Sequence, residues 1–209
     1  MPTVFANTSD GLVKNTGTAF STVRDATAGT SANNVGSTVF PSVGVSAVSA
    51  RGGGTTFNIS RAFFEFDFTG VSNVVSATLK IKQSSGDEPS IRLVKGGGFG
   101  TLDTSDYDNI TGFSAGNTMA GNVTDFIDAP ATLLGLNQVT SFTLNSAAIA
   151  DMNANDKFTV VMVGNTFDYL NVTPTAGDSN IGGVTFADTP GTSNDPQIEY
   201  TETAASARS

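Results

Sequence analysis

The 209-residue sequence contains no cysteine, no histidine and no tryptophan. Without cysteine the chain has no disulfides and no thiolate metal sites, and without histidine it lacks Ser-His-Asp and Cys-His triads and the usual proton shuttle near neutral pH. It also has no apolar run of about 18 residues, and no basic segment followed by an apolar one near its start. We therefore expect neither a membrane span nor a signal peptide. Among hydrolytic chemistries, those that need only two carboxylates remain.

Charged residues are also scarce, at 14% of the chain, and they are unevenly distributed. Residues 1–95 hold eight Lys and Arg against six Asp and Glu, whereas residues 96–209 hold two against thirteen. Nucleic-acid binding requires a basic face, so a net charge of −9 argues against a nucleic-acid partner. Serine, threonine, asparagine and glycine must make most of the surface.

Apolar and other side chains alternate in two neighbouring stretches, 60–68 and 75–82. This period of two is typical of strands with one buried and one exposed face, and residues 69–73 would connect the strands. We expect a half-buried antiparallel pair whose register is strongly specified, because a one-residue slip would place aromatic side chains in water. The inward-facing residues would be Ala62, Phe64, Phe66 and Phe68 in the first strand, and Val75, Ala77, Leu79 and Ile81 in the second.

Short alternating segments separated by turn residues continue along the whole chain. Together they predict an all-β fold, an antiparallel two-sheet jelly-roll sandwich with one or two short helical turns. A single domain would span residues 1–203, and residues 204–209 would form a mobile C-terminal tail. Further strands are expected at 18–24, 43–49, 91–95, 139–144, 158–163, 183–187 and 197–201, a helix at 146–152 after Asn145, and a helical turn at 102–108.

Two groups of acidic residues are the candidates for chemistry. Glu65 and Asp67 would lie on one strand face, as a glycosidase pair requires, but Arg61 and Lys80 or Lys82 would pair with them across strands. Residues 102–108 resemble an oxygen-rich cation loop but lack the Asp-x-Asp-x-Asp-Gly order of a calcium loop, so a capping turn is the stronger interpretation. We therefore predict no catalytic, cofactor-binding or metal-binding residues.

Several short segments, in order along residues 8 to 200, carry a resemblance to known proteins. The segment around Arg61–Asp67, followed by Ser76–Leu79, resembles the DNRLRE-type β-sandwich modules of large surface and carbohydrate-associated proteins. The wider chain resembles phage and marine viral structural proteins that share this sandwich, although position 20 is phenylalanine where tryptophan would be expected. The matching segments are Thr8–Gly11, Val23–Gly29, Arg61–Asp67, Ser76–Leu79, Thr101–Asp108, Asp168–Asn171 and Gly191–Pro196.

The resemblance implies a structural or attachment role in a virion and supplies no catalytic residues. We expect a non-enzymatic structural virion protein of a tailed bacteriophage, a homotrimeric capsid decoration (cement) protein that contacts the major capsid protein or another virion protein. The alternative is a carbohydrate- or host-receptor-binding module of a tail fibre or other virion appendage, with a glycan held by Tyr107 or Tyr169. Residues 18–50 would form an interface, and removal of residues 1–17 would leave a folded monomer.

Overall fold

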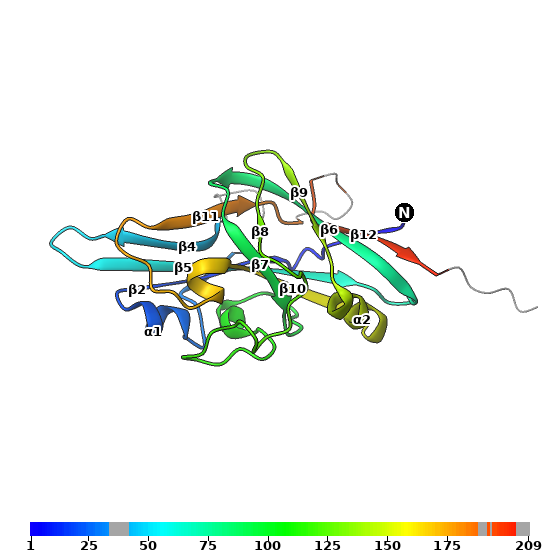
Figure 1. Cartoon of the computed structure of the whole chain (residues 1–209), viewed down its shortest axis with the longest axis horizontal. Helices are drawn as coiled ribbons and strands as arrows, with labels where there is room; N and C mark the ends of the chain where they lie inside the picture. Colours follow the sequence, from blue (N-terminus) through cyan, green and yellow to red (C-terminus); the bar gives the residue numbers. More distant parts are fainter. Residues whose placement is uncertain (34–41, 188–191, 193, 204–209) are drawn as a thin grey trace, which may run out of the picture.

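The computed structural model describes residues 1–33, 42–187, 192 and 194–203, and these residues form a large antiparallel β-structure with few short helices (Figure 1). This confirms the predicted all-β class. The strands are β1 (Thr3–Phe5), β2 (Gly11–Gly17), β3 (Ser31–Asn33), β4 (Ser42–Ser49), β5 (Thr55–Asp67), β6 (Val74–Gly86), β7 (Ser90–Lys95), β8 (Ala131–Thr132), β9 (Val139–Thr143), β10 (Lys157–Gly164), β11 (Ser179–Val184) and β12 (Gln197–Glu202). The helical segments are α1 (Phe20–Arg24), η1 (Thr104–Asp108), α2 (Ser146–Ala154) and η2 (Asn165–Tyr169).

Strand β5 is the centre of the sheet. It pairs with β2 along one edge, and with β4 and then β10 along the other. The strand order runs β1-β12-β6-β11-β4-β5-β10-β7-β8, with β3 joined to β2 and β9 joined to β6. In Figure 1 the β4–β5 hairpin projects from one end of the molecule, beyond the other strands.

The predicted pairing of residues 60–68 with 75–82 is wrong. Strand β6 pairs with β12, β9 and β11, and none of these ladders includes β5. The predicted inward faces nevertheless meet, because Phe64, Phe66, Leu79 and Ile81 belong to one buried hydrophobic cluster. The two strands thus pack side chain against side chain instead of sharing a backbone ladder.

The expectation that β5 is half-buried is also wrong. Phe63 and Glu65 on its second face are as buried as Phe64 and Phe66 on the first, because a second hydrophobic cluster covers that face. This cluster includes Phe63 and draws residues from α1, from η1 and from the long connection between β7 and β8. Sequence alternation reports one buried face, and it cannot show that a loop covers the other.

Strand β6 departs from the predicted face at its first residues. Val75 is 54% exposed and Val74 is buried in its place, because the pairing of β12 with β6 shifts register at Val74. Ala77, Leu79 and Ile81 are buried as predicted. The irregularity therefore moves only the first residue of the predicted face.

The helical segments decide three further predictions. Residues 18–24 were expected to be a strand, but Phe20–Arg24 form α1, which buries Phe20, Val23 and Arg24, the spacing of one helical face. The predicted helix after Asn145 is confirmed as α2, whose first free amides donate to the Asn145 side chain. The capping turn at 102–108 is confirmed as η1, where Asp103 and Asp106 form a reciprocal capping box.

The remaining predicted strands are found with small changes of boundary. The segments at 43–49, 91–95, 139–144, 158–163 and 197–201 correspond to β4, β7, β9, β10 and β12, while the segment at 183–187 is correct only at its start, since β11 ends at Val184. The tail at 204–209 lies outside the described residues. Within the part of the chain that the structure describes, no helix is long and apolar enough to span a membrane.

Strand β2 lies inside the sheet and is not a dispensable N-terminal extension. It pairs with β5 along all seven of its residues, and Val13 is fully buried. Removing residues 1–17 would expose an inner edge of β5 and leave a gap in the core. The structure therefore argues against the expectation that this truncation leaves a folded monomer.

Candidate functional site

Glu65 and Asp67, the predicted carboxylate pair, have different environments. The buried Glu65 accepts hydrogen bonds at Oε1 from Lys157 Nζ, at 2.7 Å, and from the Asn7 side chain, at 3.2 Å. Asp67 is exposed and accepts from the Thr69 backbone N–H at 2.9 Å. Hydrogen bonds from Thr69 lower the pKa of Asp67, and the bond to Glu65 raises the pKa of Lys157.

The predicted cross-strand partners of this pair lie elsewhere. Lys80 forms an ion pair with Glu199, and Lys82 donates to Asn194. Arg61 is fully buried and points into the second hydrophobic cluster, where it binds Asp168. The structure therefore replaces the expected surface ion pairs with one Glu65–Lys157 pair and a buried charge cluster.

Arg24, Arg61 and Asp168 form this buried charge cluster, and none of the three side chains is exposed. Arg61 donates from Nε to Asp168 Oδ2 and from Nη2 to Asp168 Oδ1, both at 2.8 Å. Its remaining donors bind the backbone carbonyls of Tyr107 and Arg24, at 2.8 and 3.0 Å. Arg24 in turn donates from Nε to the Asp168 carbonyl at 2.8 Å and from Nη1 to Asp25 at 2.6 Å.

Aromatic rings complete the surroundings of the two guanidinium groups. The Arg61 guanidinium carbon lies 4.2 Å from the centroid of the Tyr107 ring, and both arginines lie over Phe113. Burial by itself lowers the pKa of Arg61, but the charge and hydrogen bonds of Asp168, together with Tyr107 and Asp108, outweigh burial and raise it. Burial also raises the pKa of Tyr107, which keeps the phenol neutral beside the arginines. The hydrogen bonds of the cluster link α1, β5, η1 and η2.

The buried charge cluster brings together four of the segments that carry the family resemblance. Arg24 comes from Val23–Gly29, Arg61 from Arg61–Asp67, Tyr107 from Thr101–Asp108 and Asp168 from Asp168–Asn171. Segments up to 144 residues apart are thus joined by hydrogen bonds. The alternation of side chains along the sequence does not predict this site. The one sequence feature that pointed to these residues is that the matching segments contain them.

Two residues expected to contact a glycan are unsuited to that role. Tyr107 is fully buried and Tyr169 is 3% exposed. The Tyr169 hydroxyl donates to Asp125 at 2.7 Å, and burial together with this bond raises the pKa of Tyr169 to about 12. Among the described residues, no group of three or more acidic side chains is arranged to hold a metal ion.

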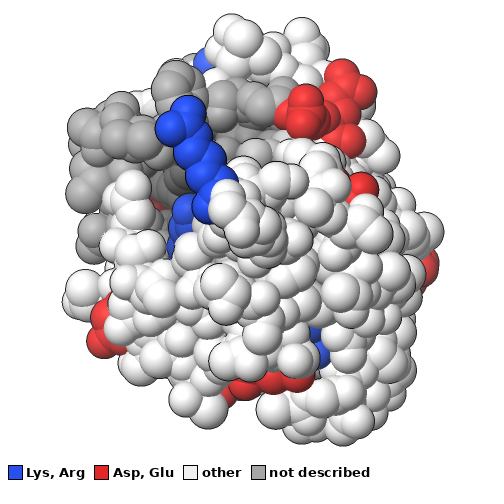
Figure 2. Space-filling view, turned by 90° about the vertical axis from the view of Figure 1, so that its left-hand side faces the viewer, with Lys and Arg blue, Asp and Glu red and all other residues white. Residues whose placement is uncertain are grey.

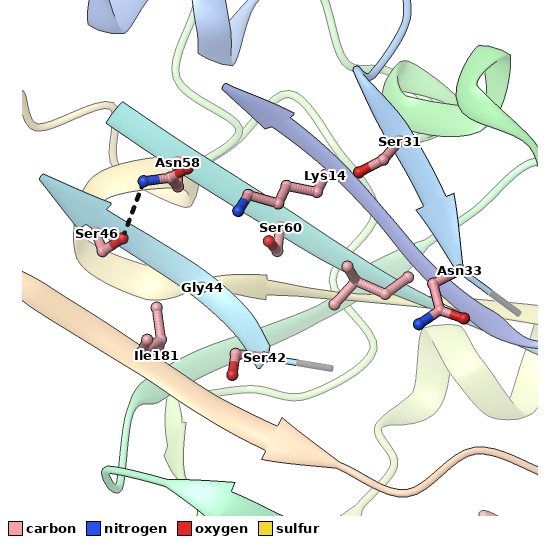
Figure 3. Close-up of a pocket in the computed structure, with 10 residues that line it drawn as sticks. Lys14, Ser31, Asn33, Ser42, Gly44, Ser46, Asn58, Ser60 and Ile181 are labelled. Carbon is pink, nitrogen blue, oxygen red and sulfur yellow. Dashed lines mark hydrogen bonds between the residues drawn. The ribbon is translucent and has the colours of Figure 1, made fainter. Parts of the chain in front are cut away.

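A polar groove lies on the open face of the sheet, where β3, β2, β5, β4 and β11 run side by side (Figure 3). Its volume is about 380 Å³. Sequence alternation places these side chains on the face opposite the second hydrophobic cluster, because Val13, Val45 and Ile59 occupy the other parity. The lining residues are Leu12, Lys14, Ser31, Asn33, Ser42, Gly44, Ser46, Asn58, Ser60 and Ile181.

The described lining of the groove consists mainly of hydroxyl and amide groups, with one basic residue and no acidic one. Asn58 is held in place, since its side chain accepts from Thr16 at 3.0 Å and lies 3.5 Å from the Ser46 hydroxyl. Figure 3 shows the Lys14 side chain extending along the groove toward Asn58 and Ser60. We call this the open-face groove.

The chain was compared with protein-family models and with curated proteins, and neither comparison found a match.

Proposed function

We propose that the chain is a non-enzymatic structural virion protein of a tailed bacteriophage, a jelly-roll β-sandwich module that decorates the capsid. The observation that carries this proposal is the buried charge cluster, where four segments of the family resemblance meet. Residues shared with virion structural proteins would thus maintain the fold, which is what a structural module requires. A resemblance based on a catalytic site would instead place such residues in an open cleft.

The surroundings of Glu65 and Asp67 support a role without catalysis. A retaining or inverting glycosidase needs one carboxyl group that is protonated and one that is free to attack or to activate water. Here Glu65 is engaged by Lys157 and Asp67 by Thr69. We expect the double variant Glu65→Gln with Asp67→Asn to keep its function, and loss of a measurable hydrolytic activity in that variant would contradict the proposal.

A homotrimer is the proposed assembly, and residues 18–50 are its proposed contact region, toward another subunit, the major capsid protein or another virion protein. Figure 2 views the end from which the β4–β5 hairpin projects and shows a face made mostly of uncharged residues, crossed by a short basic stripe. Such a face offers little charge to repel a partner. A stable interface there would bury at least about 1,000 Å².

Gradient-purified particles of the virus that encodes the chain test this proposal. We expect the chain in the particles at a fixed copy number, with gold-labelled antibodies over the heads in electron micrographs. Purified protein should also bind particles stripped of it. Absence of the chain from intact particles would refute the virion role, whereas labelling of tails alone would refute only the decoration of the head.

The second candidate function is binding of a carbohydrate or host receptor. Because Tyr107 and Tyr169 are buried, they do not form its contact surface. The open-face groove favours this candidate, since its hydroxyl and amide groups are the partners that sugar hydroxyls require.

A further inference from the structure

We propose that the open-face groove binds a monoanionic saccharide, a sugar that carries one carboxylate beside several hydroxyl groups. This inference rests on the second candidate function and specifies its site and ligand class. Three features of the described groove residues support it: a serine hydroxyl that faces the groove without a protein partner, a lysine without an ion pair, and the composition of the lining.

Ser60 supplies a hydroxyl group that faces the groove. The residue as a whole is only 6% exposed and lines the groove, and its side chain forms no hydrogen bond with any of the described residues. Its hydroxyl oxygen is not among the buried polar atoms that lack a partner, so it is open to the groove. A hydroxyl can both donate and accept, so it can bind a ligand hydroxyl, and Asn58 lies two residues away on the same face of β5.

Lys14 supplies the charge. Within the described ranges, Lys80, Lys95 and Lys157 each form an ion pair with a carboxylate, and Lys82 binds an asparagine. Lys14 has no such partner in those ranges, and no acidic side chain lines the groove with it. An ammonium group placed in this way favours a ligand carboxylate, because charge-assisted hydrogen bonds are about twice as strong as neutral ones.

The lining narrows the ligand class further. A doubly charged phosphate or sulfate is disfavoured, because the groove has a single cation on a protein of net charge −9 and no helix in its lining. The volume of about 380 Å³ is near the lower end of small-ligand sites. None of the described lining residues is aromatic, so their contribution to affinity would come from hydrogen bonds and from the multiple copies of an oligomer.

Titration of the isotope-labelled protein, followed by NMR, tests this inference. The probes are D-glucuronate, D-glucose and inorganic sulfate, and the variants are Lys14→Gln and Ser60→Ala. Lys82→Gln is the matched control, since it removes a lysine outside the groove. We expect glucuronate to shift the amide signals of β2, β4 and β5 around the groove, and Lys14→Gln to weaken its binding by about tenfold or more.

Ser60→Ala should also weaken binding of glucuronate, whereas Lys82→Gln should leave it unchanged. Glucose should bind more weakly than glucuronate, and sulfate should not displace it. The inference is overturned if no probe shifts the groove signals in the wild-type protein, if Lys14→Gln has no effect, or if sulfate competes equally, which would indicate only nonspecific attraction of anions to Lys14. A chain that binds glucuronate but is absent from virions would refute the virion role alone.

Discussion

Asp168→Asn is the most direct test of the buried charge cluster. Asp168 compensates two buried guanidinium groups, because Arg61 binds both of its carboxylate oxygens and Arg24 Nε lies 3.6 Å from Oδ1. Asparagine has nearly the same shape but carries no charge, and its amide N–H donors face the donors of Arg61. The substitution therefore leaves the buried Arg61 without a carboxylate partner, while Arg24 keeps Asp25.

The expected cost follows from that burial. Removing one partner of a buried ion pair typically costs about 3–5 kcal/mol, whereas an exposed pair contributes about 1 kcal/mol or less. Since domains are stable by about 5–15 kcal/mol, Asp168→Asn should remove a large part of the free energy of unfolding. For a chain of this size the loss corresponds to a fall in Tm of about 6–20 °C.

Urea denaturation followed by circular dichroism measures this cost. Glu88→Gln is the matched control, because Glu88 is an exposed acid and its loss should change the free energy of unfolding by less than about 1 kcal/mol. Replacing both partners, by Arg61→Met with Asp168→Leu, should be less damaging than Asp168→Asn, since the charge of Arg61 is then removed together with its partner and Arg24 keeps its ion pair with Asp25. If Asp168→Asn cost no more than Glu88→Gln, the cluster would not be the buried, desolvated unit described above.

Three further predictions concern packing, backbone conformation and titration. Phe66→Ala should cost about 3–5 kcal/mol in urea denaturation, since Phe66 is fully buried, and an unchanged Tm would contradict its place in the core. Gly44→Ala should destabilise the protein much more than Gly70→Ala, although both glycines have positive φ. A Cβ at Gly44 would clash with a backbone oxygen of β11, whereas a Cβ at Gly70 meets nothing within 4 Å. Equal losses of stability in thermal unfolding would refute this clash. Tyr169 has a pKa of about 12 in the folded protein against about 10 when unfolded, so its contribution to stability is complete below pH 10 and is lost as pH rises from 10 to 12. The difference in tyrosinate absorbance between the wild-type protein and Tyr169→Phe should therefore appear near pH 12, and its appearance near pH 10 would contradict the raised pKa. Asp125→Asn should lower the pKa of Tyr169, because Asp125 helps to raise it.

The strand pattern could be predicted from the sequence because it is local. Alternating side chains identified β5, β6, β7, β9 and β10 as strands, and the Asn145 cap located α2, since these signals depend only on neighbours along the chain. Which strands pair, in contrast, depends on contacts between distant segments. The short connection after Phe68 suggested a hairpin, but β5 is already flanked by β2, β4 and β10, which leaves no edge for β6.

The buried charges show a second limit of sequence reasoning, and it also bears on function. A charged residue in an alternating strand is expected on the solvent face, and the sequence therefore predicts that Arg61 and Glu65 are exposed, although both are buried. Burial of Arg61 is possible because Asp168, over 100 residues away, compensates its charge, and no local pattern reports such a partner. Lys14 is the opposite case, since the described fold provides no carboxylate for it. Lys14 and Ser60 form no ion pair or side-chain hydrogen bond with the described residues, and they are therefore the two groups through which we propose that the open-face groove binds its ligand.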